Sequence, residues 1–171
     1  QWLVEAAEQL RAFSRYFLCD VHVKQLQLDE LYAVLREVKA GDLSEDEAIK
    51  RLERSSYWVW TALDPESKLL VVVDVGTRSL EMAQRVVHQV VEVLAPGCLP
   101  LLLTDGFRAY MTAFLAHFGH WMQPERHQDK GPMPKPRWMP RPELLYAQVV
   151  KSYRRRRLVG VTHRVVFGTQ L

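Results

Sequence analysis

The sequence of 171 residues predicts a mixed α/β fold. Three observations support this prediction. Apolar segments of strand length recur along the chain, segments with helical spacing of apolar residues separate them, and turn-forming residues mark the junctions. After an opening helix, the expected order is strand, helix, two strands, helix, strand, helix, loop and two strands. We expect one domain, because this length and 48% hydrophobic residues suffice for a single core.

The chain is expected to open with a helix over residues 2–18, where apolar residues recur with a helical period. A strand containing Asp29 follows. Leu26 and Leu28 share one parity and would be buried, whereas Asp29 lies on the other side with Gln25 and Gln27. Glu30 falls on the side of Leu28. If one acid of this adjacent pair is catalytic, strand geometry therefore favours Asp29.

Residues 42–55 predict an inserted helix, because Ser44 and Glu47 have the spacing of a capping box. Two strands are expected next, over 57–63 and 69–75. The turn sequence that begins at Asp64 joins them into a hairpin.

Two acids of this hairpin need an interpretation. We interpret Asp64 as a turn residue rather than a ligand. Asp74 lies inside an apolar strand, and it either makes local hydrogen bonds near Gly76 or joins a site.

The central part of the chain predicts helix, strand and helix. An amphipathic helix over 80–94 ends before Pro96 and Gly97, and residues 98–104 form a nearly continuous apolar strand, as expected where both faces are covered. Asp105 and Gly106 follow at once. Residues 107–118 have helical spacing again, and Gly119 is expected at the position just after that helix.

The last part of the chain combines a loop with a basic hairpin. Residues 124–142 contain six of the nine prolines and show no periodicity, which predicts an extended loop. Residues 146–152 and 158–167 are expected to form strands. Eleven Lys and Arg residues against two acids give residues 126–171 a formal charge of +9, which leaves −6 for residues 1–125.

This charge asymmetry suggests a polyanionic partner, although a solvated charged hairpin remains the alternative. The candidate DNA-binding residues are Lys151, Arg154, Arg155, Arg156, Arg157 and Trp138. The basic side chains would contact phosphates without reading sequence. Trp138 would either stack on a base or anchor the proline-rich loop on the protein surface.

Asp29 and Asp105 are the candidate catalytic and metal-binding residues. Each closes an apolar strand, and two carboxylates at the ends of neighbouring strands can hold divalent cations. Alternatives remain open for both. Asp105 would also serve as a cap for the helix near Phe107, and Asp29 would also be satisfied by a salt bridge to Lys24 or Arg108.

Three stretches, QLQLDELYAVL, YWVWTALDPESKLLVVVDVG and LPLLLTDGFRAY, resemble DDE transposases of bacterial insertion sequences. The tail LLYAQVVKSYRRRRLVGVTHRVVFGT is similar to the segment that follows in that family, so the resemblance covers about residues 20–169. It implies a ribonuclease H-like fold, with a mixed five-stranded sheet and helices on both faces. The family's first acid lies in the first strand and its second at the end of the fourth, which correspond to Asp29 and Asp105.

The resemblance also implies a chemistry. In that family, the carboxylates hold two Mg²⁺ or Mn²⁺ ions that drive phosphodiester hydrolysis and strand transfer. DNA, as transposon ends and target, is the implied partner, and the protein is expected to form homo-oligomers. The expected location is the cytoplasm in association with the nucleoid, because no apolar segment is long enough to span a membrane and no secretory signal is seen.

The sequence departs from the family pattern in its third acid. The family places a Glu on a later helix, expected beyond the FGT segment, whereas Glu125 and Glu143 only flank the proline-rich loop. We therefore expect a fragment. Residues 1–20 would be the end of an N-terminal helical DNA-binding region, and residues 21–171 a catalytic core incomplete at its C-terminus. The alternatives are a non-catalytic DNA-binding or dominant-negative transposase remnant, and a structural domain with an ordinary salt-bridged Asp29.

Overall fold

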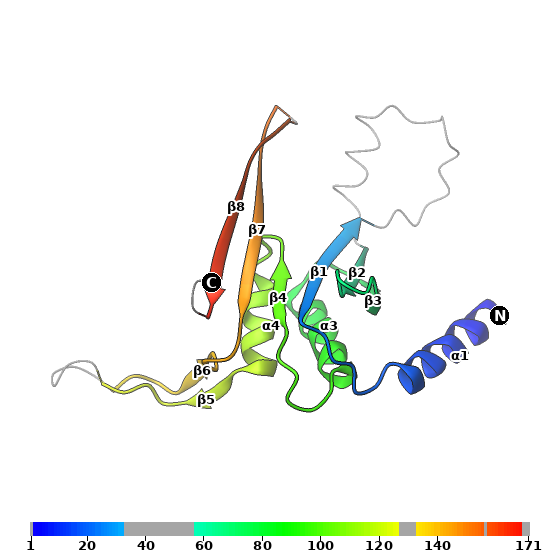
Figure 1. Ribbon diagram of the computed structural model, residues 1–171, viewed down its shortest axis with the longest axis horizontal. Helices are drawn as coiled ribbons and strands as arrows, with labels where there is room; N and C mark the ends of the chain where they lie inside the picture. The colour runs from blue at the N-terminus through cyan, green and yellow to red at the C-terminus, as the bar shows by residue number, and fades with distance from the viewer. Residues whose placement is uncertain (1, 33–56, 127–132, 156, 169–171) are drawn as a thin grey trace.

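A computed structural model describes residues 2–32, 57–126, 133–155 and 157–168 of the chain. Its main feature is a six-stranded sheet with the strand order β3-β2-β1-β4-β7-β8 (Figure 1). The helices are α1 (Trp2–Phe17), α3 (Leu80–Val93) and α4 (Ala109–Phe118). The strands of the sheet are β1 (Gln25–Tyr32), β2 (Trp58–Leu63), β3 (Leu70–Gly76), β4 (Leu101–Thr104), β7 (Tyr146–Arg154) and β8 (Arg157–Phe167).

The sheet is mixed, which confirms the predicted α/β class. β1 runs antiparallel to β2 and parallel to β4, β4 runs parallel to β7, and the outer pairs β2–β3 and β7–β8 are antiparallel. The expected number of five strands is wrong, since the sheet has six. The residue pattern itself contained six extended segments, and the resemblance alone suggested five. The additional strand is β8, which the β7–β8 hairpin adds at the edge.

The core lies between the sheet and the pair α3 and α4. Leu28 and Trp60 are buried on the sheet side, and Val86 and Phe114 are buried on the helix side. The Trp60 ring packs edge-on against the ring of Tyr110, with centroids 5.8 Å apart. The opposite sheet face, which carries Asp29, is exposed or half-buried at its described positions. Among the described residues, α3 and α4 therefore cover one face only, and the expected helices on both faces are not found there.

The central strand β4 is much shorter than its two neighbours. Its last paired residue, Thr104, lies beside Leu28 of β1 and Gln148 of β7. β1 continues to Tyr32 and β7 to Arg154, and the two strands diverge above the end of β4 (Figure 1). The sheet therefore contains a notch where its middle strand stops.

The expected opening helix is confirmed as α1, which stands apart from the sheet in Figure 1. Its apolar residues are largely exposed, among them Leu10 at 65% and Phe13 at 59%. The helix predicted over residues 42–55 lies outside the described residues. Among the described residues, no helix is both long and apolar enough to cross a membrane.

The segment around the proline-rich loop contains structure that the sequence did not predict. The short strands β5 (His120–Met122) and β6 (Arg137–Met139) pair antiparallel as a separate two-stranded sheet. Three-residue strands are too short to show a periodicity. β4 also begins at Leu101, later than the predicted residue 98.

Gly119 follows α4 as expected, but its conformation differs from the expectation. Its φ of −81° and ψ of −172° are extended, whereas the expected helix terminator is left-handed. A Cβ at this residue would overlap the carbonyl oxygens of Leu115 and Met139. Glycine is therefore required here by the last turn of α4 and by the close approach of β6.

We expect Gly119→Ala to lower the free energy of unfolding by about 1–3 kcal/mol, because the added methyl group overpacks two backbone oxygens. Urea denaturation measures this change. Gly160→Ala is the matched control, since a Cβ at Gly160 meets no atom within 4 Å. Equal effects of the two substitutions would show that the contact between α4 and β6 is not tight.

Candidate functional site

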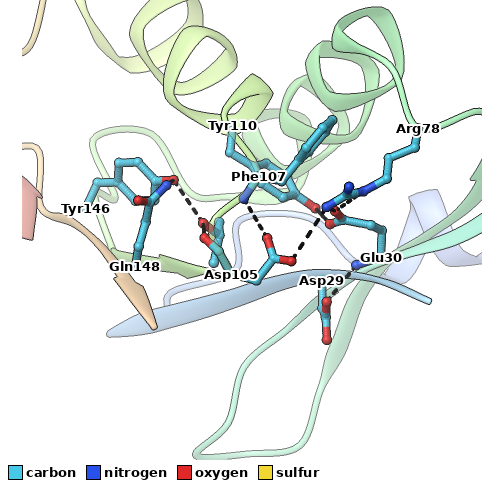
Figure 2. A network of polar contacts seen from close by, with 9 residues as sticks. Asp29, Glu30, Arg78, Asp105, Phe107, Tyr110, Tyr146 and Gln148 are labelled. Atoms are coloured by element: carbon cyan, nitrogen blue, oxygen red, sulfur yellow. Dashed lines mark hydrogen bonds and ion pairs between the residues drawn. The ribbon is translucent and has the colours of Figure 1, made fainter. Parts of the chain in front are cut away.

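Asp29 and Asp105 lie close together, at the notch above β4 (Figure 2). Asp29 belongs to β1, and Asp105 directly follows β4. These strands are parallel neighbours, so their carboxyl ends meet at the same edge of the sheet. One carboxylate oxygen from each of Asp29, Glu30 and Asp105 lies within 4.8 Å of the others. The structure thus brings the two predicted residues together and adds a third carboxylate.

The notch opens into a cleft of about 550 Å³. β1 contributes Asp29, the end of β4 contributes Asp105 and Gly106, and β7 contributes Lys151 to its lining. A Cβ at Gly106 would make only an ordinary contact with Val150, so the fold itself does not require glycine there. The missing side chain leaves the cleft open beside Asp105.

Glu30 is a third acid beside the predicted pair, and the sequence did not predict a place for it in the site. Its side chain is only 1% exposed, and Oε1 accepts hydrogen bonds from Arg78, 2.7 Å from Nε and 2.6 Å from Nη2. Tyr110 donates its hydroxyl to Oε2 at 3.2 Å. The parity of β1 correctly placed Glu30 on the side of Leu28. A buried carboxylate needs a partner. The inward position of Glu30 was therefore the feature of the sequence that could have indicated a cation beside it.

Arg78 connects Glu30 to Asp105. Its Nη2 lies 3.7 Å from Asp105 Oδ2, and its guanidinium lies over the rings of Phe107, at 4.2 Å, and Trp58, at 5.0 Å. The planar group is thus held between two carboxylates and two aromatic faces. Arg78 thereby joins three parts of the chain, namely the segment after β3, strand β1 and the end of β4 (Figure 2).

Asp105 makes a local backbone hydrogen bond but is not the cap of α4. Its Oδ1 accepts the N–H of Phe107 at 2.8 Å, whereas the helix cap is Arg108, which makes no side-chain capping bond. The Asp105 side chain remains 46% exposed. The capping interpretation is therefore wrong, and Oδ2 is directed toward Arg78 and the cleft.

Asp29 also uses one oxygen locally, since its Oδ1 accepts the N–H of Glu30 at 2.9 Å. The salt bridge considered with Lys24 is not formed, because Lys24 pairs with Glu66 at 3.4 Å. No described cation lies within salt-bridge distance of Asp29, which excludes an ordinary ion pair with Arg108 as well.

The electrostatics of the cleft favour a bound cation. Partial burial and the nearby charge of Asp105 raise the pKa of Asp29, while Lys151 and Arg78 oppose this shift. Burial, followed by Asp105, also raises the pKa of Glu30 despite its bonds to Arg78. The carboxylates therefore repel one another, and a positive ion between Asp29 and Asp105 would relieve that repulsion. Their exposed oxygens are hard ligands of the kind that Mg²⁺ and Mn²⁺ prefer, so the residues fit such ions.

A buried polar group supports the end of β4 from the side of β7. The Oγ1 of Thr104 lies 2.9 Å from the hydroxyl of Tyr146 and donates to the Asp105 carbonyl at 2.8 Å. Gln148 donates to the same Tyr146 hydroxyl at 2.8 Å. These bonds fix the backbone from which the Asp105 side chain projects (Figure 2).

The other two acids considered in the sequence lie outside the cleft. Asp64 is a turn residue as predicted, since its carboxylate accepts the N–H groups of Glu66 and Ser67 at 3.1 and 3.2 Å. Asp74 does not join the site. It pairs with Arg85 at 2.5 Å and accepts a hydrogen bond from Gln89 at 2.8 Å, so it ties β3 to α3.

The described candidate DNA-binding residues lie in three separate places. Lys151 lines the cleft, and Arg154, Arg155 and Arg157 are exposed at the tip of the β7–β8 hairpin. Arg156 lies outside the described residues. Trp138 lies on β6, away from that tip (Figure 1).

Trp138 packs against the strand that pairs with β6. Its ring is 5.8 Å from the ring of Trp121 on β5, in an edge-on arrangement. The side chain is nevertheless 43% exposed, so one part of the ring remains accessible.

Comparison of the chain with protein families, with curated proteins and with solved structures finds no match.

We expect Arg78→Met to lower the free energy of unfolding by about 3 kcal/mol, because it leaves the buried Glu30 carboxylate without its cation. Urea denaturation measures the change. The double variant Arg78→Met with Glu30→Gln should lose less than the sum of the single effects, since neither charge remains. Lys24→Met is the control. It breaks an exposed pair and should cost less than about 1 kcal/mol. Additive effects at Arg78 and Glu30 would contradict this coupling.

The raised pKa of Glu30 predicts a pH dependence of stability. The folded protein binds this proton more tightly than the unfolded chain, so the free energy of unfolding should fall as pH rises from the ordinary pKa of 4.5 through the raised value. Glu30→Gln should flatten this dependence, measured by urea denaturation at several pH values. Glu66→Gln controls for the chemical change at an exposed acid. An unchanged slope in Glu30→Gln would assign the proton to another group.

Proposed function

We propose that this chain is the catalytic core of a DDE-type transposase, which carries out DNA transposition by metal-dependent phosphodiester hydrolysis and strand transfer. The observation that carries the proposal is the convergence of Asp29 and Asp105 in an open notch between parallel strands. Structural acids are paired, as Asp74 and Glu30 are. Asp29 has no such pairing with a described cation, and it faces a cleft that a basic residue also lines.

Asp29 and Asp105 would hold two Mg²⁺ or Mn²⁺ ions. When bound, the ions supply Lewis-acid activation of a water or a DNA 3′-hydroxyl and stabilise the leaving oxygen. Such ions rely on substrate phosphate for part of their coordination, so two carboxylates suffice only together with the DNA backbone.

The protein residues position the substrate for an in-line displacement. Lys151, on the β7 side of the cleft, would neutralise a phosphate next to the one that reacts. Gly106 leaves room for the backbone of the nucleic acid beside Asp105. Arg78 holds the Asp105 side chain in place from behind, which preorganises the pair of carboxylates.

The arrangement of strands supports a ribonuclease H-like fold for this core. Three antiparallel strands, β3, β2 and β1, are followed by the parallel strands β4 and β7. In chain order, Asp29 lies in the first strand and Asp105 directly follows the fourth, the pattern that the resemblance implies. In this interpretation β8 is an addition to the five-stranded arrangement.

The proposal extends to partners and location. Transposition requires DNA at two places, transposon end and target, and the pairing of two ends suggests that the protein acts as a homo-oligomer. A protein of this kind would act in the cytoplasm, in association with the nucleoid.

One observation favours a second candidate, a non-catalytic DNA-binding or dominant-negative remnant. The third carboxylate near the cleft, Glu30, is committed to Arg78 and Tyr110. It therefore does not complete a set of three acids in this arrangement. Glu125 and Glu143 lie outside the described helices, as the sequence predicted. A remnant would bind DNA through its basic residues without cutting it.

We expect Asp29→Asn and Asp105→Asn each to reduce DNA cleavage and strand transfer by more than about 100-fold while DNA binding changes little. Mutation of a residue that only hydrogen-bonds to a metal ligand typically lowers metal affinity or activity about 10–100-fold, and loss of a direct ligand should cost more. Asp64→Asn is the matched control outside the cleft. The assay uses a labelled duplex with Mg²⁺ or Mn²⁺.

The assay is run on this chain and on any longer product of its reading frame. Cleavage and transfer only by a longer product that supplies a further Glu would support a core with three acids. Cleavage by neither, with intact DNA binding, would favour the remnant. Normal transfer by an Asn variant would remove that acid from the site.

A further inference from the structure

The β7–β8 hairpin extends far beyond the sheet from which it arises (Figure 1). β4 pairs with β7 only from Tyr146 to Gln148. Among the described residues, β7 pairs from Val149 onward only with β8, up to the last pair, Arg154 and Arg157. We call the segments Val149–Arg154 and Arg157–His163 the free ribbon. At about 3.3 Å per residue, its β7 strand projects by about 20 Å.

The free ribbon carries several positive charges and no acid of its own. The sequence from residue 144 to residue 171 contains no Asp or Glu. Lys151, Arg154, Arg155 and Arg157 are all exposed. A long edge strand that lacks acids invites contact with a polyanion rather than with a basic surface.

The turn at the tip contains an arginine where turn chemistry favours a small residue. Arg155 has a φ of 48°, in the left-handed region that Asn and Gly adopt readily in two-residue hairpin turns. An L-residue with a long side chain costs about 1–2 kcal/mol in this conformation. Arg155 therefore costs some stability at this position, as Lys68 does in the β2–β3 turn, and it places a cation at the end of the ribbon.

One face of the free ribbon continues the face that carries Asp29. The register places Gln27, Leu103 and Ala147 in line across β1, β4 and β7. Lys151 therefore lies on the same side of the sheet as Asp29, and its partner across the hairpin is Val161. On this side Leu158 and Val161 are 52% and 47% exposed. The face thus combines a cation beside the cleft with accessible apolar side chains beyond it.

We infer that the free ribbon enters the major groove of duplex DNA beside the strand held in the cleft. This inference rests on the proposed function for the identity of the polyanion. The major groove is about 12 Å wide and admits a two-stranded ribbon, whereas the minor groove, about 6 Å wide, does not. Leu158 and Val161 face the base edges, where thymine methyl groups offer apolar contacts. Arg154, Arg155 and Arg157 reach the phosphates along the groove walls.

The test compares two arginines on the same strand. Arg157→Ala removes a charge from the tip, and Arg164→Ala removes one from the base, where Arg164 pairs with Gln148 outside the free ribbon. Both side chains are exposed. Binding of the whole chain to a labelled duplex and to the same sequence as a single strand is measured without divalent metal, across a range of salt concentrations.

We expect Arg157→Ala to bind the duplex about eightfold more weakly at 0.1 M salt, with a log–log salt slope smaller by about 0.9, as for one lost phosphate contact. Arg164→Ala should change the affinity by less than about twofold. The wild-type protein should protect guanine N7 from dimethyl sulfate, because this atom lies in the major groove. Arg157→Ala should give the same protection only at about eightfold higher protein concentration.

Several outcomes would overturn the inference. Equal losses in the two arginine variants would indicate a general charge effect. Preference for the single strand, or binding without N7 protection, would exclude the major groove. A concentration-dependent dimer that Val161→Asp abolishes, with duplex binding intact, would assign the ribbon to a second copy of the chain. These measurements need no DNA cleavage, so they can be interpreted even if the protein has no transposase activity. Groove binding by an inactive protein would contradict the proposed chemistry and leave the inference about the ribbon intact.

Discussion

The arrangement of the candidate site depends on one buried ion pair. Glu30 is almost completely buried in the central part of the sheet, and a carboxylate in such a position is tolerated only with a cation and further hydrogen-bond donors. Arg78 and Tyr110 supply them from the segment after β3 and from α4. Because Arg78 also approaches Asp105, the pair joins three parts of the chain at the place where Asp29 and Asp105 meet. The pair is thus a constraint on geometry rather than a large source of stability.

Much of the fold could be predicted because each strand and helix has its own local pattern. The alternation around Leu28 gave the correct inward and outward faces of β1, and turn chemistry at Asp64 gave the β2–β3 hairpin. The number of strands in the sheet cannot be predicted from such local patterns, because it depends on which segments pair. β8 has few buried side chains and joins the sheet only through its hairpin with β7. The residue pattern found the strand, and the family expectation omitted it.

The site was predictable only in part, because sequence shows parity but not partners. Parity identified Asp29 as the outward acid, and the strand ending at Thr104 identified Asp105. The partner of Glu30 is Arg78, which lies 48 residues further along the chain. No local pattern connects those two residues. The notch itself depends on the relative lengths of β1, β4 and β7, which are set by pairing across the sheet and not by any one segment.

The short β4 strand relates the cleft to the ribbon. A middle strand that stops early leaves its two neighbours without a shared partner. β1 then continues in its pairing with β2, and β7 must continue without β4. β7 does so by pairing with β8, which produces the free ribbon, and the gap that it leaves beside β1 is the cleft. A nucleic acid that lies in the cleft would therefore also pass along the base of the ribbon, where Lys151 belongs to both. Because β4 is short, the catalytic carboxylates and the basic ribbon would thus act on one continuous stretch of DNA.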